Sequence, residues 1–510
     1  MPLSSKNSRA FSIAPLIVLH LLIALPLAYF LNIWSDEAST LYTTQHGFLA
    51  AFQHAAIDER QAPLYFWILS LWRSINDSIF FARIFSLLCS LASIKFFSGV
   101  ARHIFQPRTA FLVSAFFALH PFLIWASVEI RVYSLVILLS SVLLLLFIDG
   151  FWNDDETSQK RSRICFLIVT IVALYTNYYL GFLLAGFLAA LLISKKRRLA
   201  GAYCGLMLIA AIAVSPLLLV FRTQLSANAS GFHEATSLID GLRTLWHQLL
   251  TFVLPAEVFP DQDISGADVI RVWSVRAFIL LTVIFAIKNR KTVSPQTSSL
   301  GAITIAVFSC LLIAYFALGT GYVQVRHASV IFVPLVLFLT SLLSDIFSQE
   351  SRIVRKIVGA AGAILILASF SYALVTLFPN MTKRGDWARI GAFVEQNESP
   401  GQPIIVFTTY DALALPYHYH GVNKILPDER FFEFEAEDKF GTENSLKGQT
   451  DFVISEIPAE ANMIWLAVNE KCIVTDACRP LENYVQANYT IEKEQDFYLE
   501  KLFLLRKKAQ

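Results

Sequence analysis

Apolar segments long enough to cross a membrane recur through the first three quarters of this 510-residue chain. A membrane-spanning helix needs roughly 20 consecutive, mostly apolar residues. The pattern predicts a mainly α, polytopic membrane protein with about eleven transmembrane helices. The fifth and sixth segments are short. As an alternative, these two segments form one re-entrant pair, and the number of membrane spans is then still odd. The candidate segments are residues 11–33, 80–101, 109–127, 132–150, 164–177, 179–194, 199–221, 270–287, 299–319, 328–347 and 356–378.

Charged residues divide the chain into two parts of different character. Residues 1–379 are about 12% charged with a net charge of +9, whereas residues 380–510 are about 27% charged with a net charge of −7. A soluble domain is about 25% charged. Because 55% of all residues are hydrophobic, the composition excludes a disordered chain and a wholly soluble protein. We predict a transmembrane domain over 1–379, whose first outer loop, 34–79, carries interfacial helices, and a soluble domain over 380–510.

The C-terminal domain has the pattern of an α/β fold. Residues 387–396 suit a short helix, and residues 411–419 suit the start of another. Short apolar runs at 404–407, 464–468 and 502–505 suit strands. We predict a lid or an acceptor-binding module, and a purely structural domain is the alternative.

Basic residues between the spans set the predicted orientation. Seventeen Lys and Arg residues precede span one or follow the even-numbered spans, so all of them fall on one side of the membrane. Short cytoplasmic loops carry such an excess of positive charge. An odd number of spans then places residues 380–510 on the extracytoplasmic side. Span one is too long for a signal-peptide core and lacks a clear cleavage site before Trp34, which predicts a retained anchor.

Two of the six cysteines, Cys472 and Cys478, lie in the C-terminal domain. In an oxidising outer compartment, a pair at this spacing is typical of a local disulfide, and two free thiols are the alternative. The chain has neither a CxxC pair nor an HExxH motif. The sequence therefore names no metal ligand and no cofactor. A divalent metal is compatible with it but not required.

Two adjacent carboxylates, Asp36 and Glu37, follow directly after the first span. At a membrane interface, partial desolvation raises the pKa of a carboxylate towards a value useful for general-base catalysis. The alternative is a helix start, in which Ser35 is the N-cap and the two acids lie in the first turn. We treat both acids as candidate catalytic residues.

Four further stretches at the outer ends of spans contain candidate residues. An aromatic belt is the alternative for their tyrosines, and snorkelling or a local ion pair is the alternative for Glu129 with Arg131. Residues 38–75 also indicate two amphipathic segments that lie on the outer leaflet. The stretches are 58–67, 127–133, 175–179 and 319–327, and their candidates include Arg60, Tyr65, Glu129, Arg131, Tyr133, Tyr178 and Arg326.

Taken together, these features resemble the membrane-embedded glycosyltransferases of the GT-C superfamily. Within it, the chain resembles the branch of protein O-mannosyltransferases and lipid A aminoarabinose transferases. The resemblance covers most of residues 11–350, and residues 386–407 resemble the outer domain common in bacterial members. One departure is Gln61-Ala62, where members often have His-Pro. The matching residues are Asp36-Glu37, Pro63-Leu64-Tyr65, Glu129, Arg131, Tyr133, Tyr175 to Tyr179 and Arg326.

The resemblance implies a GT-C fold and an integral membrane glycosyltransferase. The expected donor is a sugar carried on a polyprenyl phosphate, and the expected acceptor is a lipid, a glycan or a protein at the outer face. Transfer would invert the anomeric centre, with Asp36 as the base that deprotonates the acceptor and Glu37 and Glu129 as further catalytic candidates. The style of the family suggests a bacterial inner membrane, and no nucleic acid partner is implied.

The resemblance also assigns the remaining site residues. Arginine matches phosphate oxygens bidentately and is always charged. We therefore expect Arg131 and Arg326 to bind the donor phosphate, followed in rank by Arg60 and Arg83. The tyrosines expected at the substrate pocket are Tyr65, Tyr133 and Tyr178.

A transporter or flippase of lipid-linked saccharides is the main alternative. It predicts repeated halves and ionisable residues or broken helices at mid-membrane depth. The sequence has no evident internal repeat and few charges within its spans. A non-enzymatic scaffold, with the C-terminal domain as its working part, leaves the outer carboxylates and arginines unexplained.

Overall fold

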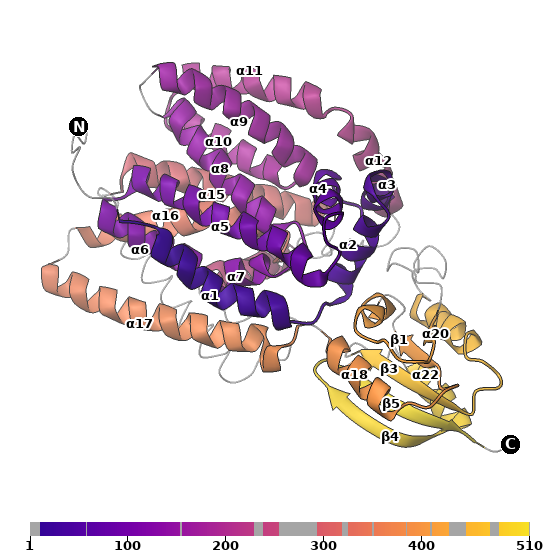
Figure 1. Cartoon of the computed structure of the whole chain (residues 1–510). Coiled ribbons are helices and arrows are strands. Elements are labelled where there is room, and N and C mark those ends of the chain that lie inside the picture. The colour runs from indigo at the N-terminus through magenta and orange to yellow at the C-terminus, as the bar shows by residue number, and fades with distance from the viewer. Residues whose placement is uncertain are drawn as a thin grey trace. The chain divides into compact units, whose positions relative to one another are not determined.

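The computed structural model of the chain forms two compact units (Figure 1). The first comprises Met1–Ala28 and Gln61–Leu377, and the second comprises Tyr29–Arg60 and Phe378–Gln510. The structure describes residues 11–57, 59–152, 156–228, 238–253, 293–318, 325–348, 351–383, 385–407, 411–427, 445–469 and 479–508.

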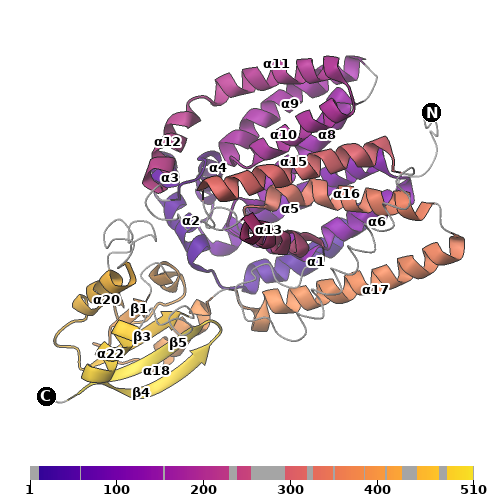
Figure 2. The ribbon, with the colours of Figure 1, turned by 180° about the vertical axis from the view of Figure 1, so that it is seen from behind.

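The described part of the first unit is helical. In Figures 1 and 2, the helices α5, α8, α16, α15 and α10 lie side by side, and each packs against the next in this order. The helices of this unit are α1 (Ala14–Phe30), α4 (Leu64–Arg73), α5 (Ile79–Ile104), α6 (Pro107–Ala118), α7 (Pro121–Ser127), α8 (Tyr133–Phe151), α9 (Glu156–Thr176), α10 (Leu180–Ile193), α11 (Arg197–Val214), α12 (Leu217–Asn228), α13 (Leu238–Val253), α15 (Pro295–Leu318), α16 (Ser329–Ser348) and α17 (Arg352–Leu377).

The chain is an integral membrane protein. Among the described residues, six helices are long and apolar enough to span a membrane, and the number rises to eight if each of two bent pairs is one span. Ten of the eleven predicted segments coincide with helices. The remaining one, 270–287, lies outside the described residues. The mainly helical membrane fold is confirmed, whereas the count of eleven spans is not.

Helices α11 and α17 bury little of their surface within the unit. Apolar side chains exposed on such a scale are unfavourable in water, but they suit the hydrocarbon of a bilayer. The surface of these helices therefore fits contact with lipid. The exposed side chains are Leu208, Ile209 and Ile212 on α11 and Ile353, Ile357, Ile364 and Leu367 on α17.

The predicted span 109–127 is broken into two helices, α6 and α7, which meet at an angle of 54°. Pro121 begins α7, and the ring of His120 caps it by accepting a hydrogen bond from the Phe122 N–H at 3.1 Å. Proline is favoured at the first helical position because the N–H that it lacks would have no partner there. α7 ends at Ser127 and α8 begins at Tyr133, so residues 128–132 form the turn between them.

The second unit joins two helices of the N-terminal segment to the C-terminal domain. Its five-stranded sheet has the order β2-β1-β3-β5-β4. Strands β2, β1 and β3 are parallel to one another, and β5 runs antiparallel to both β3 and β4. The elements are α2 (Ser35–Gln45), α3 (Phe48–Ile57), η3 (Pro379–Met381), α18 (Trp387–Asn397), β1 (Ile404–Phe407), η4 (Asp411–Leu413), η5 (Leu415–Tyr417), β2 (Ile425–Leu426), α20 (Ser445–Ser455), β3 (Met463–Asn469), α22 (Arg479–Asn488), β4 (Tyr489–Phe497) and β5 (Glu500–Lys507).

One face of the sheet forms the core of the C-terminal domain. Alternate residues of β1 and β3, with one residue of β5, are buried together there, and they are Ile405, Phe407, Ile464, Leu466 and Leu505. The predicted α/β domain is therefore confirmed, because the predicted strands lie within β1, β3 and β5 and the first predicted helix lies within α18. The predicted helix start at 411–419 is wrong, since the chain makes two short 3-10 turns there.

The first outer loop differs from its prediction. It forms three helices, α2, α3 and α4, rather than two amphipathic segments. Tyr29–Arg60 also groups with the C-terminal residues, and α2 packs against η4. The sequence-based division placed all of 34–79 in the membrane domain. The physical reason for the difference is the polarity of α2, whose Ser, Thr and acidic side chains need hydrogen-bonding partners when they are buried.

Candidate active site

The turn between α7 and α8 holds Glu129 and Arg131, and Tyr133 is the first residue of α8. All three of these predicted site residues are buried. The Ser86 hydroxyl of α5 donates a hydrogen bond to the Glu129 carbonyl oxygen at 2.5 Å. The Ser134 hydroxyl donates to the Ala126 carbonyl oxygen at 2.5 Å. These two bonds fix the turn from both sides, so a carboxylate and a guanidinium are held in a short, rigid segment.

Aromatic packing supports the same turn. The ring of Tyr133 stacks on that of Trp125, with centroids 5.1 Å apart. Trp125 in turn stacks on Phe122 at 5.6 Å. The ring of Tyr133 therefore belongs to an aromatic stack beside this turn.

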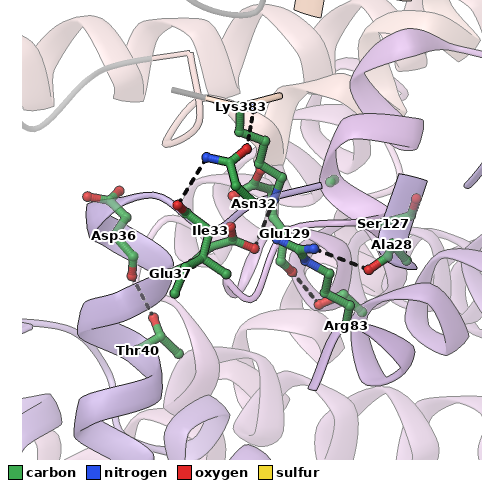
Figure 3. A network of polar contacts seen from close by, with 12 residues as sticks. Ala28, Asn32, Ile33, Asp36, Glu37, Thr40, Arg83, Ser127, Glu129 and Lys383 are labelled. Carbon is green, nitrogen blue, oxygen red and sulfur yellow. Dashed lines mark hydrogen bonds and ion pairs between the residues drawn. The ribbon is translucent and has the colours of Figure 1, made fainter. Parts of the chain in front are cut away.

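Arg83 is fully buried on α5. Its Nη1 atom donates a hydrogen bond to the carbonyl oxygen of Ala28 at 3.1 Å (Figure 3). Ala28 lies in the last turn of α1, where carbonyl groups have no partner within the helix and where a cation favours the helix dipole. The contact gives Arg83 a structural role at the end of α1. Sequence reasoning had ranked it only as a phosphate ligand.

Two predicted motifs that are far apart in the sequence are neighbours in the first unit. The ring of Tyr179, at the α9–α10 turn, stacks on the ring of His327 with centroids 5.7 Å apart and planes 8° apart. His327 follows Arg326 directly, and Arg326 is partly buried. Tyr178 packs its ring against Phe221 at 5.2 Å. The structure therefore brings the tyrosine motif to the segment that carries Arg326.

Tyr65 and Arg60 belong to different units. Tyr65 is buried on α4 of the first unit, with its ring 6.2 Å from that of Phe85. Arg60 is the last residue of the N-terminal segment of the second unit and has a φ of 48°. At Gln61-Ala62, where members of the resembled family often have His-Pro, the Gln61 carbonyl oxygen accepts a hydrogen bond from the Gln224 side chain at 3.3 Å.

Asp36 and Glu37 lie in the first turn of α2, and both are buried. The helix begins at Ser35, so Trp34 is the N-cap, and it makes no side-chain cap bond. The alternative that made Ser35 the N-cap is therefore wrong. The acids still lie where the helix dipole favours negative charge. The Asp36 carbonyl oxygen accepts a hydrogen bond from the Thr40 hydroxyl at 3.2 Å.

Glu37 is paired with a residue that sequence reasoning missed. Its Oε1 atom lies 2.9 Å from Nζ of Lys383, and the side chains are 0% and 4% exposed (Figure 3). Lys383 belongs to no motif, and it follows the last span within a polar segment. The only sequence signal was its place at the entry to the C-terminal domain.

Asn32 makes a second link between the same two segments. Its Oδ1 atom accepts hydrogen bonds from the Lys383 N–H at 2.7 Å and from the Thr382 hydroxyl at 2.9 Å. Its amide nitrogen donates to the Gly385 carbonyl oxygen. The same nitrogen also donates to the Ile33 carbonyl oxygen at 3.2 Å. Three hydrogen bonds of this buried side-chain amide thus tie Asn32 to the segment 382–385.

A cavity of about 540 Å³ lies beside this network in the second unit. Burial raises the pKa of Asp386 in its wall, although the ion pair that Asp386 makes with Arg389 at 2.9 Å opposes the shift. The cavity mixes apolar and polar groups, and it is lined by Phe30, Asn32, Asn380, Met381, Thr382, Asp386, Ala388 and Arg389.

Among the described residues, no three His, Cys, Asp or Glu side chains gather as a metal site. Cys472 and Cys478, the predicted disulfide, lie outside the described residues.

Comparison with known proteins identifies the fold of the chain. Residues 60–220 match the sequence model of the family described as dolichyl-phosphate-mannose-protein mannosyltransferase. The structure of ArnT from Cupriavidus metallidurans in the apo state superposes with a TM-score of 0.59, covering 96% of this chain and 97% of that chain at 13% sequence identity. The chain has the GT-C fold.

Further comparisons agree on this fold. The same ArnT bound to undecaprenyl phosphate superposes with a TM-score of 0.54 at 13% identity, again covering 96% of this chain and 97% of that chain. No curated protein matches the chain in sequence. In the GT-C fold of this chain, as expected from the sequence, apolar helices precede a C-terminal sheet domain.

Proposed function

We propose that the protein is an integral membrane glycosyltransferase that transfers a sugar from a polyprenyl-phosphate-linked donor to an acceptor at the outer face of the membrane. The observation that carries this proposal is the likeness to ArnT over nearly the whole length of both chains. The ArnT structure with bound undecaprenyl phosphate supports the choice of a polyprenyl phosphate. The match to the mannosyltransferase family over residues 60–220 supports sugar transfer.

The base in this proposal is Asp36. An acceptor hydroxyl becomes a good nucleophile as its proton is removed, and a positioned base typically contributes about 10²–10⁴-fold to the rate. Asp36 lies in the first turn of a buried helix that directly follows α1. Direct attack on the anomeric carbon breaks its bond to the phosphate oxygen, so the configuration inverts. Glu129 is the reserve candidate for this role.

The leaving group is a lipid phosphate, and Arg131 and Arg326 are its proposed ligands. Charge-assisted bonds from a guanidinium to phosphate oxygens are strong and can be bidentate. Developing charge on the phosphate is stabilised most where water is excluded. Arg131 is buried in a fixed turn, so it is held ready before the donor arrives. Arg60 is the next candidate phosphate ligand. Arg83 is the last candidate, because it already donates a hydrogen bond to the Ala28 carbonyl oxygen at the end of α1.

The proposed location is the inner membrane of a bacterium, with the C-terminal domain outside. The positive-inside distribution of Lys and Arg supports this orientation. The acceptor is a lipid, a glycan or a protein, and Tyr65, Tyr133 and Tyr178 are the proposed pocket tyrosines.

Sugar transfer by the purified full-length protein in detergent tests the proposal. A donor with a radiolabelled sugar on a polyprenyl phosphate is incubated with lipid, glycan and peptide acceptors in separate reactions. The proposal expects labelled product and free polyprenyl phosphate in equal amounts, with the anomeric configuration inverted. If the labelled donor is moved across a vesicle membrane but never cleaved, the chain is a transporter and the proposal is wrong.

A further inference from the structure

The segment Thr382–Asp386 is tied to the start of the first loop by several buried contacts. The Asn32 side chain receives two hydrogen bonds from Thr382 and Lys383 and donates one to Gly385. A further bond runs from the Ile33 N–H to Nε2 of His418 at 3.2 Å. The backbone immediately before α2 is therefore fixed by residues of the C-terminal domain.

Lys383 adds a charged contact to α2 itself. Its Nζ atom lies 2.9 Å from Oε1 of Glu37, and neither side chain is appreciably exposed to solvent. A buried charge is tolerated only when an opposite charge and hydrogen bonds compensate it. Turning Glu37 away from Lys383 would lose this buried ion pair, so the pair favours one rotation of α2 about its axis.

A second contact holds another part of α2. The Ser39 hydroxyl donates to Oε1 of Glu59 at 2.7 Å, and the Thr43 hydroxyl lies 3.5 Å from the same atom. Successive residues of a helix point about 100° apart, because a turn takes 3.6 residues. Once Glu37 and Ser39 are both fixed, the direction of Asp36 is fixed as well.

We propose that Lys383 is a positioning residue for the transfer reaction. It binds Glu37, sets the rotation of α2 and thereby directs the neighbouring Asp36 at the acceptor hydroxyl. This inference rests on the proposed function, in which Asp36 is the base. It also gives the C-terminal domain a defined part in the reaction, since one of its residues orients the catalytic helix.

The test compares three variants of the full-length protein purified in detergent. Lys383→Met removes the charge and keeps the length of the side chain, and Lys383→Arg keeps the charge. The matched control is Lys501→Met, which removes a lysine that pairs with Glu494 and Asp496 at the surface of the same unit. Rates are divided by the amount of monodisperse protein, and kcat and the donor KM are measured separately.

We expect Lys383→Met to lower kcat by about tenfold or more while the donor KM stays within about twofold. The reason is that the variant misorients the base Asp36 but leaves the donor-binding residues unchanged. Lys383→Arg should recover most of the rate, and Lys501→Met should match the wild type. A kcat for Lys383→Met equal to that of Lys501→Met overturns the inference. Should Lys383→Met fail to fold, the double variant Glu37→Gln with Lys383→Met removes both charges. It is expected to fold and to be slow, and a wild-type kcat overturns the inference.

The same experiment separates this inference from the proposed function. If the wild type transfers no sugar, or if Asp36→Asn transfers normally, the proposed function is wrong. If Asp36→Asn is inactive and Lys383→Met has a normal kcat, the proposed function stands and only the role of Lys383 is wrong.

Discussion

Lys383 and Glu37 form a buried ion pair, with Nζ and Oε1 2.9 Å apart, although they lie on opposite sides of the membrane domain in the sequence. The pair joins the first helix after α1 to the segment that follows α17. The pair gives Glu37, the acid next to the proposed base, a partner of opposite charge in its buried position.

Loss of Glu37 should destabilise the protein. Glu37→Ala leaves the Lys383 ammonium buried without this carboxylate, and breaking a buried pair in this way costs about 3–5 kcal/mol. Equilibrium unfolding of the full chain in detergent measures the cost. The control is Glu492→Ala, which breaks the exposed pair with Arg506 and should cost less than about 1 kcal/mol. Equal costs for the two variants would show that the buried pair adds nothing.

Lysine should not replace arginine at the proposed phosphate ligands. A Lys ammonium is a point charge and cannot reproduce the planar fork of donors. Hydrogen bonds to charged groups contribute about 1.5–3 kcal/mol, so Arg131→Lys and Arg326→Lys should each weaken donor binding by roughly 10- to 100-fold. Donor titration and single-turnover rates measure the effect. Wild-type affinity and turnover in both variants would assign these arginines to another role.

The C-terminal domain should lose stability in acid through Glu398. Burial alone would raise the pKa of this carboxyl, but hydrogen bonds from Tyr419, Asn423 and the Val422 N–H outweigh it and hold the pKa below its ordinary value of 4.5. A carboxylate with a lowered folded-state pKa stabilises the fold above its unfolded pKa and loses this contribution as the pH falls through the folded-state pKa.

Thermal unfolding of the full chain at neutral pH and at about pH 4 or below tests this linkage. Glu398→Gln should unfold at a lower temperature than the wild type at neutral pH, and the difference should shrink as the pH falls. Glu482→Gln, at an exposed site on α22, is the control. A Glu398→Gln deficit that is the same at both pH values would contradict the linkage.

Much of the fold follows from hydropathy alone. An apolar segment of nearly 20 residues has few structures available in a bilayer, so ten predicted spans coincide with helices. Local chemistry was harder to predict. The break at His120-Pro121 depends on a capping ring, and the two helices that it separates are each too short to stand out in the sequence.

The candidate site was predictable only where its residues are close in sequence. Glu129 and Arg131 lie in the turn before α8 and Tyr133 is the first residue of that helix, so a single motif found all three. The partner of Glu37 could not be found in this way, because nothing in the local sequence couples it to Lys383. The stacking of Tyr179 on His327 was likewise invisible, although each residue lies in a stretch that the sequence had singled out.

The orientation of the C-terminal domain remains a prediction with a direct test. We expect Cys472 and Cys478 to form a disulfide on the extracytoplasmic side of the membrane, where oxidising conditions preserve it. An impermeant thiol reagent applied to intact cells after mild reduction should label both cysteines, and a Cys472→Ser/Cys478→Ser variant should lose that signal. Labelling that appears only after lysis would contradict the topology.

The central claim is that Asp36 is the base of a glycosyl transfer, and the transfer rate of Asp36→Asn tests it most directly. Asparagine keeps the size of the side chain and removes its basicity. The control, Asp496→Asn, changes an aspartate that is 73% exposed in the same unit. We expect Asp36→Asn to lower the rate of sugar transfer by about 10²–10⁴-fold with donor binding close to that of the wild type, and Asp496→Asn to transfer normally. Transfer by Asp36→Asn at the rate of Asp496→Asn would contradict the account.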